Sequence, residues 1–354
     1  MRTMIKTASA VFLLAASWCA AQSLREAADR AGILLGAAVN VRHLTEPAYT
    51  STLAREFNMV EPEDAMKWRD IHPAEKTFDF GPADRIVEFA QNHGMKVRGH
   101  TLLWATHNPE WLTQGKYTRE QLSVLLHDHI NEVVGHYRGR VFAWDVVNEA
   151  FEEHGWLRKS IWYDQPGIGA GKHTDYIAQA FRWAHQADPS ALLFYNDAEI
   201  EQVDRKSNAV YKMAKRFKQR GVPIDGIGMQ MHVLHGAPNI ASIATNIARF
   251  TKLGLQVHIT ELDVALPVDG EGKASNPSDL QRQAEIYREI SRVCLQNPRC
   301  TALQTWGFTD KYSWIGWETH RTKGAALLFD SQYQPKPSYD AIKQALMQWP
   351  RRQR

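Results

Sequence analysis

Residues 141–149 read Val-Phe-Ala-Trp-Asp-Val-Val-Asn-Glu, an apolar, β-rich run that ends abruptly in an amide and a carboxylate. Residues 258–263, His-Ile-Thr-Glu-Leu-Asp, repeat this form and also contain a glutamate. A single glutamate at a strand end is commonly a helix cap or a surface charge, but a buried apolar strand has little other reason to end in one. Together, Glu149 and Glu261 meet the need of glycosidic bond hydrolysis for one protonated and one ionised carboxyl group.

The two runs belong to a longer alternation of strand-like and helix-like segments. Strands are predicted at 33–40, 58–62, 96–100, 141–148, 192–196, 226–231, 257–261 and 301–306. Amphipathic helices are predicted at 46–57, 81–92, 118–137, 175–187, 204–220, 239–253, 277–296 and 338–347. Eight strands, each followed by a helix or a long loop, predict an α/β protein with a single-domain (β/α)8 TIM barrel.

The strands share a direction of polarity, because their first residues are apolar and their last are polar or aromatic. These last residues are Asn40, Glu63, His100, Glu149, Asn196, Asp197, Gln230, His232, Glu261 and Trp306. A barrel places the carboxyl ends of its strands on one face, where its active site lies. We therefore expect these side chains to form one site.

The first 21 residues have the composition of a secretory signal. Arg2 and Lys6 are basic, residues 8–16 are apolar, and residues 19–21, Cys-Ala-Ala, form a small-residue cleavage site. We expect cleavage near Ala21, which leaves residues 22–354 as a secreted or periplasmic catalytic domain. A lipoprotein is the alternative, but bulky Trp18 precedes the cysteine, where a small residue is required.

The overall charge gives no reason to expect nucleic acid or an acidic membrane as a partner. The formal net charge is +3, and removal of the signal leaves about +1. After the signal, no run approaches the ~20 apolar residues of a membrane-spanning helix. No repeat or linker divides the chain, and a monomer is the default expectation.

Two cysteines remain once the signal is removed, and they predict a disulfide. Cys294 and Cys300 are six positions apart, with Asn297 and Pro298 forming a turn between them. Exported proteins favour disulfides, although two free thiols are the alternative. No Cys-x-x-Cys or histidine ligand spacing occurs, so no metal and no cofactor are expected.

The residues around the two glutamates suggest roles in the same chemistry. Glu149 is expected to act as the acid and later as the base, with Asn148 bonding a sugar hydroxyl unless it merely caps the following segment. His232 is expected to donate a hydrogen bond to Glu261 and keep it ionised, as a nucleophile requires, unless it is an ordinary interior histidine. Asp263 lies on the same side of the extended chain as Glu261.

Aromatic residues near the strand ends are candidates for sugar platforms. Trp104, Trp306 and Trp314 fall on the proposed active face, and the chain contains 12 tryptophans. A single tryptophan is more often part of a core than a platform. Several at strand ends favour the binding of sugars, which present flat apolar faces to aromatic rings.

With these segments assembled, the chain resembles the family-10 glycoside hydrolases, whose main members are endo-1,4-β-xylanases. The resemblance covers roughly residues 24–347. The matching segments are 36–40 (Gly-Ala-Ala-Val-Asn), 62–68 (Pro-Glu-Asp-Ala-Met-Lys-Trp), 98–104 (Arg-Gly-His-Thr-Leu-Leu-Trp), 144–150, 194–197, 228–232 (Gly-Met-Gln-Met-His), 259–263, 305–310 and 334–337. The Cys294–Cys300 pair also falls where many of these enzymes carry a disulfide.

The resemblance implies a retaining double displacement, with Glu149 as acid/base and Glu261 as nucleophile. The two carboxyl groups should then lie ~5–5.5 Å apart. It further implies a set of residues facing the sugars on the non-reducing side: Glu63, Lys67, His100, Trp104, Asn148, Gln230, His232, Trp306 and Trp314. We add Asp64, His107 and Asn196 to the substrate-binding set.

The chain departs from the family pattern at several sugar-contacting positions. Asp64 stands where Asn is usual, Ala105 where His is usual, His107 where Gln is usual, and residues 198–199, Ala-Glu, replace an aromatic-Asn pair. These changes either retune the subsites, in which case restoring Asn, His and Gln should raise xylanase activity, or they are neutral drift.

Three other functions remain open. The first is a related retaining glycosidase with a different or decorated glycan, and the second is a non-catalytic carbohydrate-binding barrel. The third is a metal-dependent barrel hydrolase, which would require histidines at several strand ends. Residues 38–40 read Ala-Val-Asn, and the two histidines of residues 127–129 fall on a predicted helix.

Overall fold

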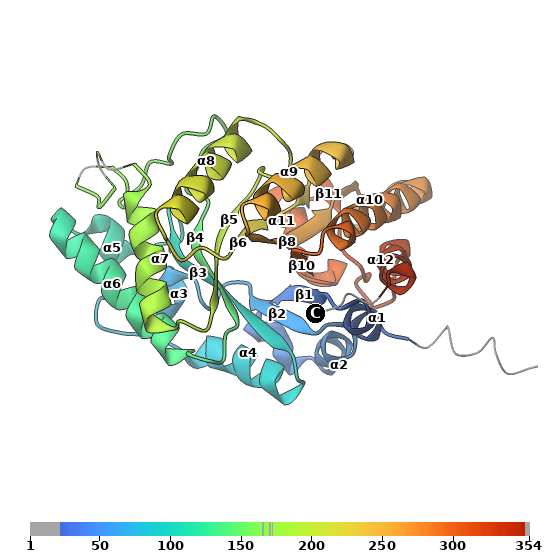
Figure 1. Cartoon of the computed structure of the whole chain (residues 1–354). Helices are drawn as coiled ribbons and strands as arrows, with labels where there is room; N and C mark the ends of the chain where they lie inside the picture. The colour runs from blue at the N-terminus through green and yellow to red at the C-terminus, as the bar shows by residue number, and fades with distance from the viewer. Residues whose placement is uncertain (1–21, 165, 170, 172, 351–354) are drawn as a thin grey trace, which may run out of the picture.

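The computed structural model describes residues 22–164, 166–169, 171 and 173–350. Within these ranges the chain forms a closed barrel of eight parallel strands with helices outside it (Figure 1). The strands, in pairing order, are β1 (Leu34–Val39), β2 (Met59–Pro62), β3 (Lys96–Trp104), β4 (Ala143–Asn148), β5 (Leu192–Asp197), β6 (Gly226–Met229), β8 (Gln256–Val264) and β10 (Cys300–Thr305). Strand β10 pairs with both β1 and β8, which closes the barrel. The predicted single-domain (β/α)8 fold is confirmed, and the predicted signal, residues 1–21, lies outside the described residues.

Helices surround the barrel on its outer side. The eight predicted ones are α2 (Pro47–Glu56), α4 (Gly81–Asn92), α6 (Arg119–His136), α7 (Asp175–Ala187), α8 (Arg205–Gln219), α9 (Ile240–Lys252), α10 (Pro277–Gln296) and α12 (Pro337–Gln348). Each is confirmed, with a difference of at most one residue at either end. The predicted strands are also confirmed, although β3 and β8 extend further toward the active face than their apolar runs indicate.

Several short elements were not predicted from the sequence. They are α1 (Leu24–Ala31), η1 (Val41–Thr45), α3 (Trp68–Ile71), α5 (Glu110–Gln114), β7 (His232–Val233), β9 (Leu266–Pro267), η2 (Asp310–Tyr312), α11 (Ile315–Glu318) and β11 (Lys323–Gly324). The sequence does contain a signal for the start of α1. Ser23 and Glu26 form a capping box, in which the side chain of each residue accepts from the backbone N–H of the other. This helix packs against α12, so the two ends of the folded chain lie together.

The disulfide prediction is confirmed. Cys294, in the last turn of α10, is bonded to Cys300, the first residue of β10. The bridge therefore fixes the short turn that returns the chain from the outer helix to the barrel.

Across the described part of the chain, no helix combines the length and the apolar composition needed to cross a lipid bilayer.

Glycine is required where a large side chain covers a strand. Gly99 of β3 is in register with Trp144 of β4, and a Cβ at Gly99 would lie 2.3 Å from the Trp144 ring. The Trp144 ring is fully buried between the barrel and its helices, so it has little room to retreat.

We therefore expect Gly99→Ala to lower the free energy of unfolding by about 1–3 kcal/mol, the cost of overpacking a dense core. Gly135→Ala is the matched control, because Gly135 lies in α6 and a Cβ there would meet no atom within 4 Å. That change should raise stability by roughly 0.5–1 kcal/mol through helix propensity. Urea unfolding of both variants measures the difference; equal stabilities would contradict the close approach at Gly99.

Candidate active site

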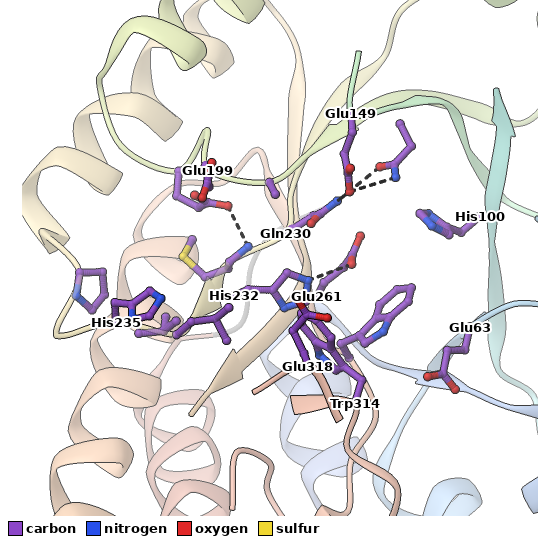
Figure 2. A pocket seen from close by; sticks show the side chains of 18 of the residues that line it. Glu63, His100, Glu149, Glu199, Gln230, His232, His235, Glu261, Trp314 and Glu318 are labelled. Atoms are coloured by element: carbon purple, nitrogen blue, oxygen red, sulfur yellow. Dashed lines mark hydrogen bonds and ion pairs between the residues drawn. The ribbon is translucent and has the colours of Figure 1, made fainter. Parts of the chain in front are cut away.

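The carboxyl ends of the barrel strands meet in one cleft of about 940 Å³. Its lining contains 13 of the predicted site residues: Glu63, Asp64, Lys67, His100, Trp104, His107, Asn148, Glu149, Gln230, His232, Glu261, Trp306 and Trp314. In Figure 2, Glu149 and Glu261 point toward one another, while Glu63 and Glu199 lie on opposite sides of them. Two predicted site residues, Asn196 and Asp263, are fully buried and do not line the cleft.

Glu149 directly follows β4 and enters the cleft from a strained turn. Its φ of 51° lies in the left-handed region, which residues other than glycine rarely adopt. Its N–H donates to the carbonyl oxygen of Asn196 at 2.9 Å, which helps to hold the turn. The side chain then accepts from the Gln230 amide at 2.9 Å and from the Trp104 indole N–H at 3.2 Å. Both carboxyl oxygens of Glu149 are therefore positioned by neighbouring strands.

Glu261 lies in β8 and is held by two donors. Asn196 Nδ2 donates to Oε1 at 2.7 Å, and His232 Nε2 lies 3.2 Å from Oε2. Burial alone would raise the pKa of Glu261. The hydrogen bond and charge of His232, the charge of His100 and the Asn196 bond outweigh burial, so the pKa of Glu261 lies below its usual value. Glu261 is therefore ionised at neutral pH.

His232 occupies the space between two carboxylates. Its Nδ1 lies 3.0 Å from Asp263 Oδ2, which also accepts from the Trp314 indole N–H at 2.8 Å. Burial would lower the pKa of His232, but the charges and hydrogen bonds of Asp263 and Glu261 raise it well above its usual value. The imidazolium can then donate to both carboxylates at once, as the predicted contact with Glu261 requires.

Asn196 connects the two glutamates from below the cleft. Its Nδ2 donates both to Glu261 and, at 2.9 Å, to Asn148 Oδ1, while its own oxygen accepts from the Thr260 hydroxyl at 2.8 Å. A Cβ at Gly228 would lie 2.2 Å from the Asn196 oxygen, so the glycine makes room for this amide. The structure thus gives Asn196 a supporting position rather than a place in the cleft lining.

Inside the barrel, beneath the cleft, lies a buried ionic cluster that the sequence analysis missed. The Arg98 guanidinium donates to Glu61 at 2.6 Å and also to Asp145, and these three side chains have no exposed surface. Asp145 in turn accepts from His100 Nδ1 at 2.9 Å. The cluster therefore fixes His100, a cleft residue, to β2, β3 and β4. Its signal in the sequence was the presence of charged residues of opposite sign within three apolar strands.

The protonation of this cluster follows from burial. Burial raises the pKa of Glu61 to about 7, with the Arg98 charge opposing that rise. Burial would lower the pKa of His100, but the Asp145 hydrogen bond and the Glu61 and Asp145 charges raise it. One cation between two buried carboxylates leaves an excess negative charge, which favours the binding of a proton by the cluster and raises the pKa of both Glu61 and His100.

A second group of charges forms the corner of the cleft near β2. Lys67 Nζ lies 3.0 Å from Asp64 Oδ1 and stands 5.4 Å from the Trp104 ring centroid and 5.7 Å from that of Trp306. Burial, and then the negative charge of Asp64, raise the pKa of Glu63 to about 7, with Lys67 opposing them. The negative charge of Asp64 therefore adds to the effect of burial on the pKa of its neighbour.

His107 forms a small stack at the same corner. Its ring lies parallel to Trp104, with the centroids 4.3 Å apart. Burial, followed by the positive charge of Lys67, lowers the pKa of His107 to about 4, so the ring is neutral at neutral pH. Ala105, the third departure in this region, does not line the cleft, and its carbonyl oxygen accepts from the Asn108 amide at 3.1 Å.

The opposite side of the cleft contains acidic residues that were not predicted as a group. Glu199, Glu201, Asp204 and Glu318 contribute to the lining, and Trp317 lies at the rim with 82% of its surface exposed. Glu199 and Glu201 follow β5 on a loop and Asp204 caps α8, while Trp317 and Glu318 lie in the short helix α11 after β10. Strand patterns give no information about any of these positions. The acidic run in residues 197–204 was the available signal.

One group of potential metal ligands lies close together in the described residues: Glu61, His100 and Glu261. Each already has a partner, because Glu61 binds Arg98, His100 binds Asp145, and Glu261 binds Asn196 and His232. A cation there would lie beside the Arg98 guanidinium and repel it. We therefore assign no metal to these residues.

Comparison with known proteins gives consistent similarities along almost the entire chain. Residues 23–345 match the profile of Glycosyl hydrolase family 10. The endo-1,4-beta-xylanase B of Thermotoga neapolitana is 45% identical over 326 residues, which cover 91% of each chain. Crystal structures of xylanase 10B from Thermotoga maritima and from Thermotoga petrophila RKU-1, the latter in complex with xylobiose, are each 47% identical, with a TM-score of 0.86. Each alignment covers 92% of this chain and 98% or 97% of the other.

The charge on His232 can be measured directly. Below the unfolded pKa of about 6.5, its raised folded pKa contributes stability, which is lost as the pH rises through the folded value. We expect side-chain 15N NMR to show a doubly protonated His232 ring at pH 7.5. Asp263→Asn should move its titration toward 6.5, because the strongest charge that raises the His232 pKa is removed.

The same spectrum contains an internal control. His129 is fully buried, and among the described residues its ring nitrogen partner is His72 and not a carboxylate. Burial lowers its pKa well below the usual value. It should remain neutral at pH 7.5 in both proteins. A neutral His232 ring in the unsubstituted protein would contradict the assigned hydrogen bonds.

Proposed function

The chain belongs to glycosyl hydrolase family 10 and is a glycoside hydrolase, and we propose that it is a secreted endo-1,4-β-xylanase that cleaves internal β-1,4-xylosidic bonds with retention. The observation that carries this proposal is the pair of glutamates joined through Asn148, Asn196 and Gln230. A xylanase name on a relative covering 91% of the chain, and xylobiose in a homologous structure, support xylan as the substrate.

The proposed reaction has two displacements at the anomeric carbon. In the first, an oxygen of Glu261 bonds to that carbon while the glycosidic C–O bond breaks and Glu149 gives its proton to the leaving oxygen. In the second, Glu149 takes a proton from water, the water oxygen bonds to the anomeric carbon, and the bond to Glu261 breaks. This two-step mechanism requires the two carboxyl groups to lie about 5–5.5 Å apart.

The supporting residues have distinct parts in this proposal. His232, charged and bonded to Asp263, keeps Glu261 ionised and oriented for attack. Asn148 is proposed to bond the sugar hydroxyl next to the reacting carbon. Trp306 and Trp314 offer apolar faces, and Glu63, Lys67, His100 and Gln230 offer hydrogen bonds to the remaining sugars.

Export is a separate part of the proposal. The basic and apolar composition of residues 1–21 supports it, and so does the Cys294–Cys300 disulfide, since such bonds persist in oxidising compartments. The intact mass of the exported protein tests the expected start at Gln22.

The catalytic assignment predicts a simple substrate panel. The wild-type protein should release xylo-oligosaccharides from xylan, with less or no product from mixed-linkage glucan and cellulose. Glu261→Ala should lose activity by roughly 10⁴-fold or more, because the nucleophile is removed. NMR of the first product should show the β-anomer.

The outcomes of this panel separate the competing functions. Product from glucan but none from xylan would support a related glycosidase with another substrate. A folded wild-type protein that binds xylan without cleaving any substrate would support a non-catalytic barrel. An α-anomer as first product would contradict retention. Activity that survives Glu261→Ala would contradict the assignment of the nucleophile.

Asp64 gives a prediction about pH. Glu63, with its pKa of about 7, changes from an acid to a carboxylate near neutrality. A carboxylate is the stronger acceptor for sugar hydroxyls, so KM for xylo-oligosaccharides should rise as the pH falls through about 7. Asp64→Asn removes a like charge, lowers the pKa of Glu63, and should reduce KM at pH 6 by roughly threefold to fivefold.

Asp70→Asn is the matched control, since Asp70 is an exposed acid on α3 that does not line the cleft. Its KM profile should remain that of the wild type. Identical profiles for Asp64→Asn and wild type would favour neutral drift at position 64.

A further inference from the structure

The charges of the molecule are unevenly distributed although their sum is small. Eight carboxyl side chains line the catalytic cleft, against two cations, Lys67 and the charged His232. Helix α8, by contrast, contains no acidic residue, and its exposed cations are Arg205, Lys212, Lys215, Arg216 and Lys218. An anionic ligand is therefore repelled by the cleft and attracted by the outer face of α8.

A groove of about 680 Å³ lies along this basic helix, outside the catalytic cleft. One wall is α8, and the other is the segment that follows β4, with Phe151, Trp156 and Leu157. The cleft and the groove are neighbours, because Asp204 lines the first and Arg205, the next residue, lines the second.

Trp156 is presented to this groove by a tight turn. Glu152 N–H donates to the Trp156 carbonyl at 2.8 Å, and Gly155 N–H donates to the Glu152 carbonyl at 2.7 Å. A Cβ at Gly155 would lie 2.9 Å from the Arg205 carbonyl, so the turn is seated directly on α8. The indole of Trp156 nevertheless remains 75% exposed, which makes it an open apolar surface at a fixed position.

Three cations of α8 face the groove. Arg205, Lys212 and Arg216 are spaced by seven and then four residues, which places them on one side of the helix. All three are exposed, and in the described part of the chain none of them forms an ion pair or a side-chain hydrogen bond. Glu152 and Glu153 are exposed nearby but do not line the groove.

We propose that this groove is a second glycan-binding site, specific for an acidic polysaccharide segment such as xylan substituted with uronic acid. Trp156 stacks on a pyranose ring, and Arg205, Lys212 and Arg216 pair with the uronic carboxylates. That the ligand is a glycan rests on the proposed function of the protein. That the ligand is acidic rests only on the positive charges of the groove. The groove would then hold the uronic acid-substituted part of a xylan chain, while the acidic cleft beside it binds unsubstituted parts of the same chain.

The test measures binding without catalysis. The mature Glu261→Ala protein is run in native gels containing glucuronoxylan, with excess neutral xylohexaose to occupy the cleft. We expect Trp156→Ala and Lys212→Glu each to weaken retardation at least about fivefold. Lys215→Glu, the matched control, carries the same charge change on the same helix but does not line the groove, and should stay within about twofold.

Two further arms define the ligand. Neutral arabinoxylan should bind several-fold more weakly than glucuronoxylan, and 0.3 M NaCl should remove most of that difference by screening. In the active background, Trp156→Ala and Lys212→Glu should cleave xylotriose at the wild-type rate, because neither residue lines the cleft. Normal thermal unfolding of these surface variants confirms that they are folded.

Several results would overturn the proposal. Equal weakening by Lys212→Glu and Lys215→Glu would indicate diffuse attraction without a site. Unchanged binding by Trp156→Ala would remove the stacking surface, and equal retardation by a DNA oligonucleotide would indicate binding of any polyanion. Absence of xylan hydrolysis by the wild type would count against the proposed function alone, since these gels do not depend on turnover.

Discussion

The buried guanidinium of Arg98 is the interaction on which the active face depends. It joins Glu61 of β2 to Asp145 of β4 inside the barrel, where water cannot replace either partner. Removing one partner of such a cluster commonly costs about 3–5 kcal/mol, because a charge is left buried without compensation. His100 bonds to the Asp145 carboxylate as well, so this buried bond fixes the position of a side chain that lines the cleft.

Above this cluster, one amide coordinates the two proposed catalytic carboxylates. Asn196 donates to Glu261 directly and reaches Glu149 through Asn148. A substitution of Asn196 would therefore change the surroundings of both carboxylates together. The strained backbone of Glu149 belongs to the same arrangement, since its N–H bonds to the carbonyl of Asn196. Strain is tolerated there because the Asn196 carbonyl of β5 holds the backbone of Glu149, and Gln230, the residue after β6, holds its side chain.

The fold and the membership of the cleft could be predicted from the sequence, because both depend on which residues end the strands. Glu149, Glu261 and His232 were found this way, and the family resemblance is confirmed over residues 23–345. The ionic cluster was missed because it depends on which strand residues face inward, and apolar runs buried on both faces carry no alternation to reveal this. The acidic residues that follow β5 and β10 were missed because they lie on loops, at a helix cap or in the short helix α11, which no periodicity marks. The roles of the site residues stay predictions.

The contact between the first and last helices has a consequence for how the chain acquires its structure. Helix α1 packs on α12, β1 pairs with β10, and Tyr339 donates to the side chain of Glu56 at 3.1 Å. Segments that are synthesised early, α1 and β1, therefore pack against segments that are synthesised much later, α12 and β10. A chain that emerges from its amino terminus can form local strand–helix units, but its barrel closes only once β10 is available to pair with β1. Folding is therefore completed late and through contacts of great sequence separation.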